Sequence, residues 1–440
     1  TVYLKDAAET KGLVVIDNGG LDPDLSEMTS LSGMITDDIE VVGARVRVEE
    51  TDIGDPAVFG TITLTDSYLQ QEAGLTVENF TMTHGTWIQN GEFAVTGTYD
   101  VATTSVSRNS AYDIPDYDPI MTVPSGSTEI LSVACTVCTK IIVQGSLVLD
   151  VDNSNLTEIV VDGGSLEVNV ANPSLNLLTM NNAMVVINAE VQGVTDLDVN
   201  GSVLEVNLAS TFNLNSLTVR NSGLVRHGTA SDENSPKLDI EVADLIVEAD
   251  SYIDVSSKGL LPSGTGSWYG GSHAGLGGAG GSTGSSGTAN ATHGDIYAPT
   301  DFGNGGDGDG VVVRGGGSLK LRVTNELVLD GDILANGQTY TGSDTRPYCG
   351  GGAGGSVWLD VNTIRGTGAV AANGGDAKIH HSGGGGGGRV SLQYQNADGF
   401  NLENVYARGG SRVSNGYRHG GAGTVYLKDA AETKGLVVID

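Results

Sequence analysis

The sequence predicts an all-β chain whose coils stack into a parallel β-helix, or β-solenoid. Between about 127 and 226, apolar residues recur every 19 residues or so. Within each repeat they alternate with polar residues, as in a half-buried β-strand, and Asn, Asp or Gly separates the repeats. One coil cannot bury its inward face alone, whereas stacked coils share a core and a continuous hydrogen-bond ladder.

Two columns of residues define the 19-residue coils. An apolar column of expected core positions consists of Ile130, Leu149, Val168, Ile187, Val206 and Val225. A polar column consists of Asp150, Asn169, Asn188 and Asn207, again 19 apart. Stacked amides can hydrogen-bond along the axis, so we expect a structural ladder. A site in which these carboxamides hold a sugar or an ion is the alternative.

The coil pattern changes along the chain, but we expect one continuous solenoid. Residues 18–99 read as irregular coils. The Pro- and Asp-rich stretch 100–126 breaks the pattern and is expected to be a surface excursion between coils. Residues 127–236 carry the 19-residue coils. Residues 237–440 carry coils of about 35 residues, expanded by long glycine-rich loops.

The expanded coils align with one another, but this alignment does not decide whether their long loops are ordered. They start at Ser318, Ser356, Arg389 and Thr424. One core column is expected at Ile333, Val370, Val405 and Val438. The chain contains 66 glycines. The glycine loops are either disordered flaps or ordered glycine stacks against the solenoid, and their low charge favours the ordered alternative.

The same 17 residues, TVYLKDAAETKGLVVID, stand at 1–17 and at 424–440, offset by 423 positions. We expect about 423 residues to form one unit of a tandem array, or of identical subunits joined head to tail. Thr1, Asp17, Thr424 and Asp440 bound the junction. No polar cap is visible in the sequence. Roughly 16 coils at about 4.8 Å each predict an axial repeat of about 80 Å.

Composition limits the classes of partner. The net charge of −32 disfavours nucleic acid, whose phosphates would be repelled. No apolar run reaches the length of a membrane-spanning helix. We expect an extracellular or cell-surface location, with copies of the chain along the fibre axis as partners. Lateral contacts with other fibres or with polysaccharide are a further expectation.

Few residues suggest chemistry. Cys135 and Cys138 predict a local disulfide or free thiols; a redox or metal half-site is the alternative, although a second pair of metal ligands is missing, and Cys349 stands alone. The string GGDGDG offers Asp307 and Asp309 as candidate calcium ligands, and no other cofactor is expected. Glycosylation sequons stand at Asn79, Asn155 and Asn290.

The coil pattern resembles the right-handed parallel β-helix superfamily, which holds pectate lyases, polygalacturonases and many secreted adhesins. The glycine-rich half is similar to repeats of very large surface proteins of microbes. The resemblance implies a single-stranded, right-handed coil. Enzymes of this superfamily use clustered carboxylates with Arg, Lys or His.

The catalytic signatures of those enzymes are not assembled in this sequence. Asp37-Asp38 is the one adjacent Asp pair, and Arg226-His227 lies near Asp232 and Glu233 in sequence only. We therefore expect a non-enzymatic structural repeat of a secreted fibre or filament. The stalk of a giant cell-surface adhesin is the first alternative, and a polysaccharide lyase or hydrolase is the second.

Overall fold

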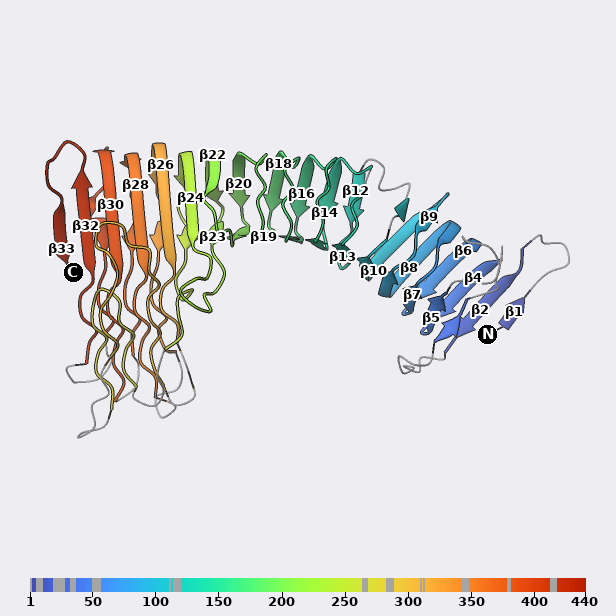
Figure 1. Cartoon of the computed structure of the whole chain (residues 1–440), viewed down its shortest axis with the longest axis horizontal. Helices are drawn as coiled ribbons and strands as arrows, with labels where there is room; N and C mark the ends of the chain where they lie inside the picture. Colours follow the sequence, from blue (N-terminus) through green and yellow to red (C-terminus); the bar gives the residue numbers. More distant parts are fainter. Residues whose placement is uncertain are drawn as a thin grey trace. The chain divides into compact units, whose positions relative to one another are not determined.

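The computed structural model shows an all-β chain, as predicted, with long sheets in which most strands pair in parallel (Figure 1). It describes residues 2–4, 11–18, 28–31, 37–49, 57–110, 112–113, 120–135, 137–262, 268–281, 289–308, 311, 313–341, 348–377, 381–411 and 418–440. The chain divides into two compact units, Thr1–Val194 and Thr195–Asp440. Each is described below by itself.

The first unit is built from short strands that pair with a strand of the next repeat. Its strands are β1 (Val2–Leu4), β2 (Leu13–Asp17), β3 (Thr29–Ser30), β4 (Asp38–Val42), β5 (Arg45–Val48), β6 (Ala57–Thr65), β7 (Tyr68–Gln71), β8 (Leu75–Gln89), β9 (Phe93–Val95), β10 (Tyr99–Arg108), β11 (Tyr112–Asp113), β12 (Ile120–Val123), β13 (Thr128–Leu131), β14 (Lys140–Val143), β15 (Ser146–Leu149), β16 (Glu158–Asp162), β17 (Ser165–Val168), β18 (Leu177–Asn181) and β19 (Met184–Ile187). One parallel ladder runs β12–β14–β16–β18, and another runs β10–β13–β15–β17–β19. Alternate residues of these strands are buried, which places the core between the ladders.

The predicted apolar column is correct in part. Leu149, Val168 and Ile187 are in register on successive strands and are buried. The residue in register with Leu149 on β13 is Leu131, whereas Ile130 points away from the core. The corner at Gln144–Gly145 is one residue shorter than the corner at Asp162–Gly164. A fixed spacing of 19 counted back from Leu149 therefore reaches a residue on the other face of β13.

The stretch 100–126 is not simply a surface excursion. Residues 100–108 continue β10, which pairs in parallel with β8 over its length, and β12 begins the β12–β14 ladder. Prolines at 115 and 119 lie outside the described residues. Pro124 follows β12 directly, where the chain leaves the ladder and a proline costs no ladder hydrogen bond. The alternation of polar and apolar residues in TTSVSR therefore predicts this strand correctly, whereas the nearby prolines wrongly suggested a break.

The second unit continues the same design with longer repeats. Its strands are β20 (Asp196–Asn200), β21 (Val203–Val206), β22 (Phe212–Arg220), β23 (Leu224–Arg226), β24 (Leu238–Val247), β25 (Tyr252–Asp254), β26 (Ser318–Leu329), β27 (Asp332–Leu334), β28 (Ser356–Arg365), β29 (Val370–Ala371), β30 (Arg389–Ala397), β31 (Val405–Tyr406), β32 (Thr424–Asp429) and β33 (Leu436–Ile439), with a short 3₁₀ helix η2 (Leu402–Asn404). Parallel ladders run β20–β22–β24–β26–β28–β30–β32 and β21–β23–β25–β27–β29–β31.

The predicted starts of the expanded coils are confirmed. Ser318, Ser356, Arg389 and Thr424 are in register on four adjacent strands.

The core columns of this unit need two corrections. Ile333, Val370 and Val405 form the predicted column, but Val438 does not continue it, because β33 turns back and pairs antiparallel with β32, opposite Val425. Val225 is in register with Leu204 rather than with Val206, because this repeat is two residues longer than 19.

The described parts of the glycine loops are ordered and closely packed. In Figure 1 they leave the strands β24 to β32 as long extended segments that run side by side. The amides of Gly383 and Gly386 donate to one neighbouring segment, those of Gly384 and Gly387 to a second, and those of Gly385 and Gly388 to a third. This period of three, with bonds only between segments, is typical of polyproline II geometry. We call these segments the glycine layer (268–281, 303–308, 350–355, 372–377, 383–388, 407–411 and 418–423).

The glycine layer requires glycine for steric reasons. A Cβ atom on Gly385 would lie 1.9 Å from the carbonyl oxygen of Gly352, and one on Gly351 would lie 1.9 Å from that of Gly375. Real side chains do not approach backbone oxygens so closely. The glycine-rich composition of this half of the chain therefore follows from the packing of its loops.

Candidate functional site

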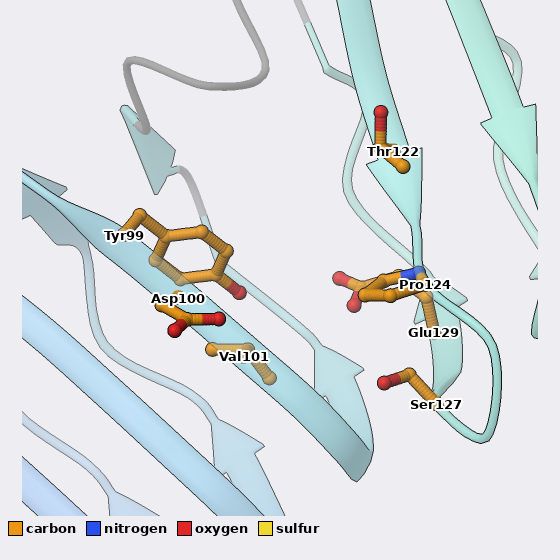
Figure 2. Close-up of a pocket in the computed structure, with 7 residues that line it drawn as sticks. All are labelled: Tyr99, Asp100, Val101, Thr122, Pro124, Ser127 and Glu129. Atoms are coloured by element: carbon orange, nitrogen blue, oxygen red, sulfur yellow. The ribbon is translucent and has the colours of Figure 1, made fainter.

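A pocket of about 380 Å³ opens in the first unit between β10 and the segment β12–β13 (Figure 2). Tyr99, Asp100 and Val101 of β10 form one wall. The opposite wall consists of Thr122, Pro124, Ser127 and Glu129. The lining side chains include one aromatic ring, two carboxyl groups and three hydroxyl groups, which suits a small polar ligand.

The pocket exists because the ladder is interrupted at this point. The second half of β10, Ser105–Arg108, pairs with β13, but β12 pairs with β14 and not with the first half of β10. The first half of β10 therefore pairs on one side with β8 and faces the pocket on the other.

Glu129, on the pocket wall, forms a buried ion pair with Arg108. Arg108 is fully buried and Glu129 is 4% exposed. The Nε atom of Arg108 pairs with the Glu129 carboxylate. Its Nη1 donates to Oε1 of Gln89 at 2.9 Å, and its Nη2 donates to the hydroxyl of Tyr99 at 2.7 Å. These contacts hold the guanidinium rigidly.

Aromatic rings complete the surroundings of Arg108. The guanidinium carbon lies 4.9 Å from the ring centre of Trp87 and 4.7 Å from that of Tyr112. Cation–π contacts of this kind are strongest where water is excluded. Phe80 and Phe93 pack against Trp87 and extend the apolar surroundings.

The surroundings shift the acid–base behaviour of Glu129. Burial raises its pKa to about 7, and the attraction of Arg108 opposes that rise. Burial also raises the pKa of Tyr112. A carboxyl group with a near-neutral pKa at the wall of a pocket can exchange protons at physiological pH.

The two carboxyl groups of the pocket lie on opposite walls. Hydrolysis of a glycosidic bond needs two carboxyl groups on either side of the scissile bond. Asp100 and Glu129 stand on opposite walls, but Glu129 is held by Arg108, and no His or Lys is among the described residues that line the pocket. The side chains on the two walls suit a small polar group, and the Glu129 carboxylate is already paired with Arg108.

Neither Arg108 nor Glu129 stands out in the sequence as a site residue. A signal was present, because each occupies an inward position of an alternating strand, where an apolar residue is the rule. Two opposite charges on inward positions, 21 residues apart, would have suggested a pair between adjacent coils.

The polar column forms hydrogen bonds within each unit. In the first unit Nδ2 of Asn169 donates to Asp150 at 2.8 Å, and Nδ2 of Asn188 donates to Asn169 at 2.7 Å. In the second unit Oδ1 of Asn207 accepts from the amide of Gly228 at 2.6 Å. The bonds in the first unit are exposed to solvent and lie along the stack.

A second, buried Asn pair escaped the sequence analysis. Asn153 and Asn172 are 1% and 0% exposed. Oδ1 of Asn153 accepts from the amide of Cys135, and Oδ1 of Asn172 accepts from the amide of Asn153, both at 2.9 Å. Their spacing of 19 residues was the available signal. These side chains satisfy main-chain donors at the buried corners of the coils.

The residues considered for catalysis have structural contacts. Nε2 of His227 accepts from the amide of Ser318, and burial lowers the pKa of this fully buried histidine to about 4. Arg226 pairs with Glu205 at 2.9 Å rather than with Asp232 or Glu233.

The adjacent Asp pair binds main-chain amides. Oδ1 of Asp37 accepts from the amide of Gly12 at 2.9 Å, and Oδ1 of Asp38 accepts from that of Thr61 at 2.6 Å.

The calcium candidates and the cysteines are placed as follows. Asp307 is fully buried in the glycine layer, and Asp309 lies outside the described residues. Within the described part of the chain no group of three or more His, Cys, Asp or Glu side chains could hold a metal ion. Cys135 and Cys138 are joined in a disulfide, and Cys349 is a buried, reduced cysteine.

The three sequons differ in accessibility. Asn155 is exposed on a corner, and Asn290 is half-buried. Asn79 is half-buried on β8, where its amide donates to Thr61 and its carbonyl accepts from the amide of Thr98. A glycan on Asn79 would be attached to the same Nδ2 atom that donates to Thr61.

The junction residues lie at strand ends. Asp17 ends β2 and Thr424 begins β32, while Thr1 lies outside the described residues. The carboxylate of Asp440 accepts from the amide of Ala407 at 3.3 Å and lies 3.6 Å from Nε of Arg408.

Among the described residues, no helix has the length and apolar character needed to cross a membrane. Comparison with protein-family models, with curated proteins and with solved structures gave no match.

Proposed function

We propose that the chain is a structural repeat unit, about 423 residues long, of a secreted extracellular fibre or filament. In this proposal the unit folds as a single-stranded, right-handed parallel β-helix. Units follow one another along the fibre axis, either as covalent tandem repeats or as stacked subunits. The observation that carries the proposal is the identity of residues 1–17 and 424–440, because it makes both ends of the unit the same segment.

The strand pairing supports a rod. Successive strands of each ladder come from successive repeats and run in parallel, so each repeat presents a new edge to the next. An edge of unpaired amides and carbonyls is a template for another strand. A stack of this kind grows along one direction, which suits a fibre.

Two further observations fit an extracellular location. The Cys135–Cys138 disulfide suits an oxidising compartment. The strongly acidic surface keeps a large polymer soluble by repulsion between copies. Lateral contacts with other fibres or with polysaccharide belong to the same proposal.

The proposal is tested on the native polymer. Electron micrographs should show thin filaments with an axial repeat of about 80 Å, given roughly 16 coils of about 4.8 Å. Native protein that exists only as a particle of one unit's mass, 45.1 kDa for the chain, would refute it. Intact mass measurement also separates one giant chain, as expected for an adhesin stalk, from many joined subunits.

A further inference from the structure

The two copies of the 17-residue segment fold into the same hairpin. In the N-terminal copy β1 and β2 pair antiparallel with Val2 opposite Val15. In the C-terminal copy β32 and β33 pair antiparallel with Val425 opposite Val438. The second register is the first one shifted by the 423 positions of the repeat.

A side-chain contact is also repeated in both hairpins. A Cβ atom on Gly12 would lie 2.5 Å from the ring of Tyr3, and one on Gly435 would lie 2.3 Å from the ring of Tyr426. The tyrosine ring therefore covers the same glycine in both copies, although the strands around the two copies differ. Both copies therefore form this hairpin beside different neighbouring strands.

Among the described residues, each copy has a neighbouring strand that the other copy lacks. In the N-terminal copy the second strand, β2, pairs in parallel with β4, and Val14 and Ile16 are 5% and 4% exposed. The same residues of the C-terminal copy, Val437 and Ile439, are 43% and 75% exposed.

The first strand shows the reverse. Tyr3 is 53% exposed in the N-terminal copy. In the C-terminal copy β32 pairs in parallel with β30, and Tyr426 is half-buried against Tyr297, with ring centres 4.9 Å apart. A segment with both neighbours would have both of its strands covered.

We propose that in the assembled array one copy of this segment serves two successive units at once and keeps its hairpin. Its first strand stays paired with β30 of the unit before. Its second strand pairs in parallel with β4 of the unit after, in the register that β2 and β4 show. The partner is a second copy of this repeat, and the inference rests on the function proposed above. It replaces the continuous coil that the sequence predicted at the junction.

Polar contacts extend the same interface. In the N-terminal copy Nζ of Lys11 lies 2.6 Å from Glu78, and the amide of Gly12 donates to Asp37. The equivalents of Lys11 and Gly12 are Lys434 and Gly435. They meet Glu78 and Asp37 of the following unit in the array.

The hairpin also determines the side on which the next core lies. Residues directly opposite in an antiparallel pair point to the same face of the sheet. Val425, 1% exposed, faces the core of its own unit and stands opposite Val438. Val438 is the equivalent of Val15, which points away from the core that Val14 helps to form. Successive units therefore place their cores on opposite faces of one continuous sheet.

Disulfide trapping at the internal junction of a protein of two tandem units tests the hairpin. In a Cys349→Ala background, Leu427→Cys with Leu436→Cys joins positions that are opposite in the hairpin. Val405→Cys with Val438→Cys joins the positions that a continuous coil would bring together. We expect the first pair to form a disulfide on mild oxidation and the second not to. The reverse result overturns the inference and leaves the fibre proposal standing.

Amide hydrogen exchange tests the pairing with the following unit. The amides of the second strand should exchange at least about tenfold more slowly at the internal junction than in the C-terminal copy, because only the internal strand has a β4 neighbour. Equal exchange, with the hairpin disulfide formed, would contradict both the shared segment and a continuous rod.

A charge reversal provides the matched control. Lys434→Glu at the internal junction should remove part of the protection, and Glu78→Lys in the second unit should restore it. Lys11→Glu, which changes only the outer N-terminal copy, should leave it unaltered. Loss of protection that Glu78→Lys does not restore contradicts the proposed contact.

Discussion

Residues 99–187 of the first unit and the glycine layer of the second unit satisfy their buried polar groups in different ways. In the first region, side chains such as Arg108, Asn153 and Asn172 reach the groups that need partners. In the glycine layer, main-chain amides and carbonyls of adjacent segments bond directly to one another. The first solution depends on a few specific side chains, and the second depends mainly on main-chain groups that glycine allows to approach closely.

The largest expected effect is at the buried ion pair. Arg108→Leu removes the partner of Glu129 and the bonds to Gln89 and Tyr99, so the free energy of unfolding should fall by about 4 kcal/mol. Urea unfolding followed by Trp87 fluorescence, with Trp268 and Trp358 replaced by Phe, measures it. Lys140→Leu is the control, because it removes a half-exposed pair with Glu158 and should cost less than about 1 kcal/mol. Equal losses would mean that burial does not strengthen the Arg108 pair.

Gly385→Ala tests the glycine layer. The added Cβ meets a backbone oxygen 1.9 Å away, so neighbouring segments must separate, at a cost of about 3 kcal/mol. Hydrogen exchange of the layer amides reports the loosening. Gly421→Ala is the matched control, since its Cβ would meet nothing closer than 3.1 Å. If both variants behave alike, close packing does not explain the glycines.

The stability of the two regions should also differ in its pH dependence. Glu129 of the first unit titrates, whereas the main-chain hydrogen bonds of the glycine layer do not. The pKa of Glu129 is raised to about 7 in the folded state, so the unfolded state loses this proton first as the pH rises. The contribution of Glu129 to stability is therefore full below about pH 4.5 and falls by about 3 kcal/mol as the pH rises to about 7.

Comparison of the wild type with Glu129→Gln isolates that contribution from other titrating groups. The difference in unfolding free energy between the two proteins should change over this pH range. A constant difference would show that the pKa of Glu129 is not raised in the folded state relative to the unfolded state.

Asn172→Val should have an intermediate effect. The variant leaves the buried amide of Asn153 without its acceptor, which costs about 2 kcal/mol. Valine fits the site, because Val191 occupies the equivalent corner of the next repeat and is buried. Thermal or urea unfolding measures the loss. A neutral result would mean that the main chain finds another partner.

The smallest effect is expected on the exposed ladder. Asn169→Ala removes bonds to Asp150 and Asn188 that water can replace, so stability should change by less than about 0.5 kcal/mol. The same unfolding assay compares it with Asn172→Val. A larger loss than that of Asn172→Val would assign the ladder a main role in holding the coils together.

Local patterns in the sequence were sufficient for several features. The alternation of apolar and polar residues determined the strands, and the four starts from Ser318 to Thr424 determined the register of the glycine-rich half. The spacing of 19 also located the contacts of Asp150, Asn169 and Asn188. These features repeat at fixed intervals, so neighbouring coils impose the same local choice on each copy.

Other features were decided only by the tertiary structure. Arg108 and Glu129 meet because β10 and β13 are adjacent, and the pocket that Glu129 lines opens because β12 does not pair with β10. The corner at Gln144–Gly145 is one residue shorter than the next one, so Leu131 rather than Ile130 continues the core column on β13. The hairpin of the repeated segment also became visible only in the structure, since β33 pairs with β32 where the coil pattern predicted a place beside β31. Edges and corners depend on how the coils stack, which the sequence of a single coil does not contain.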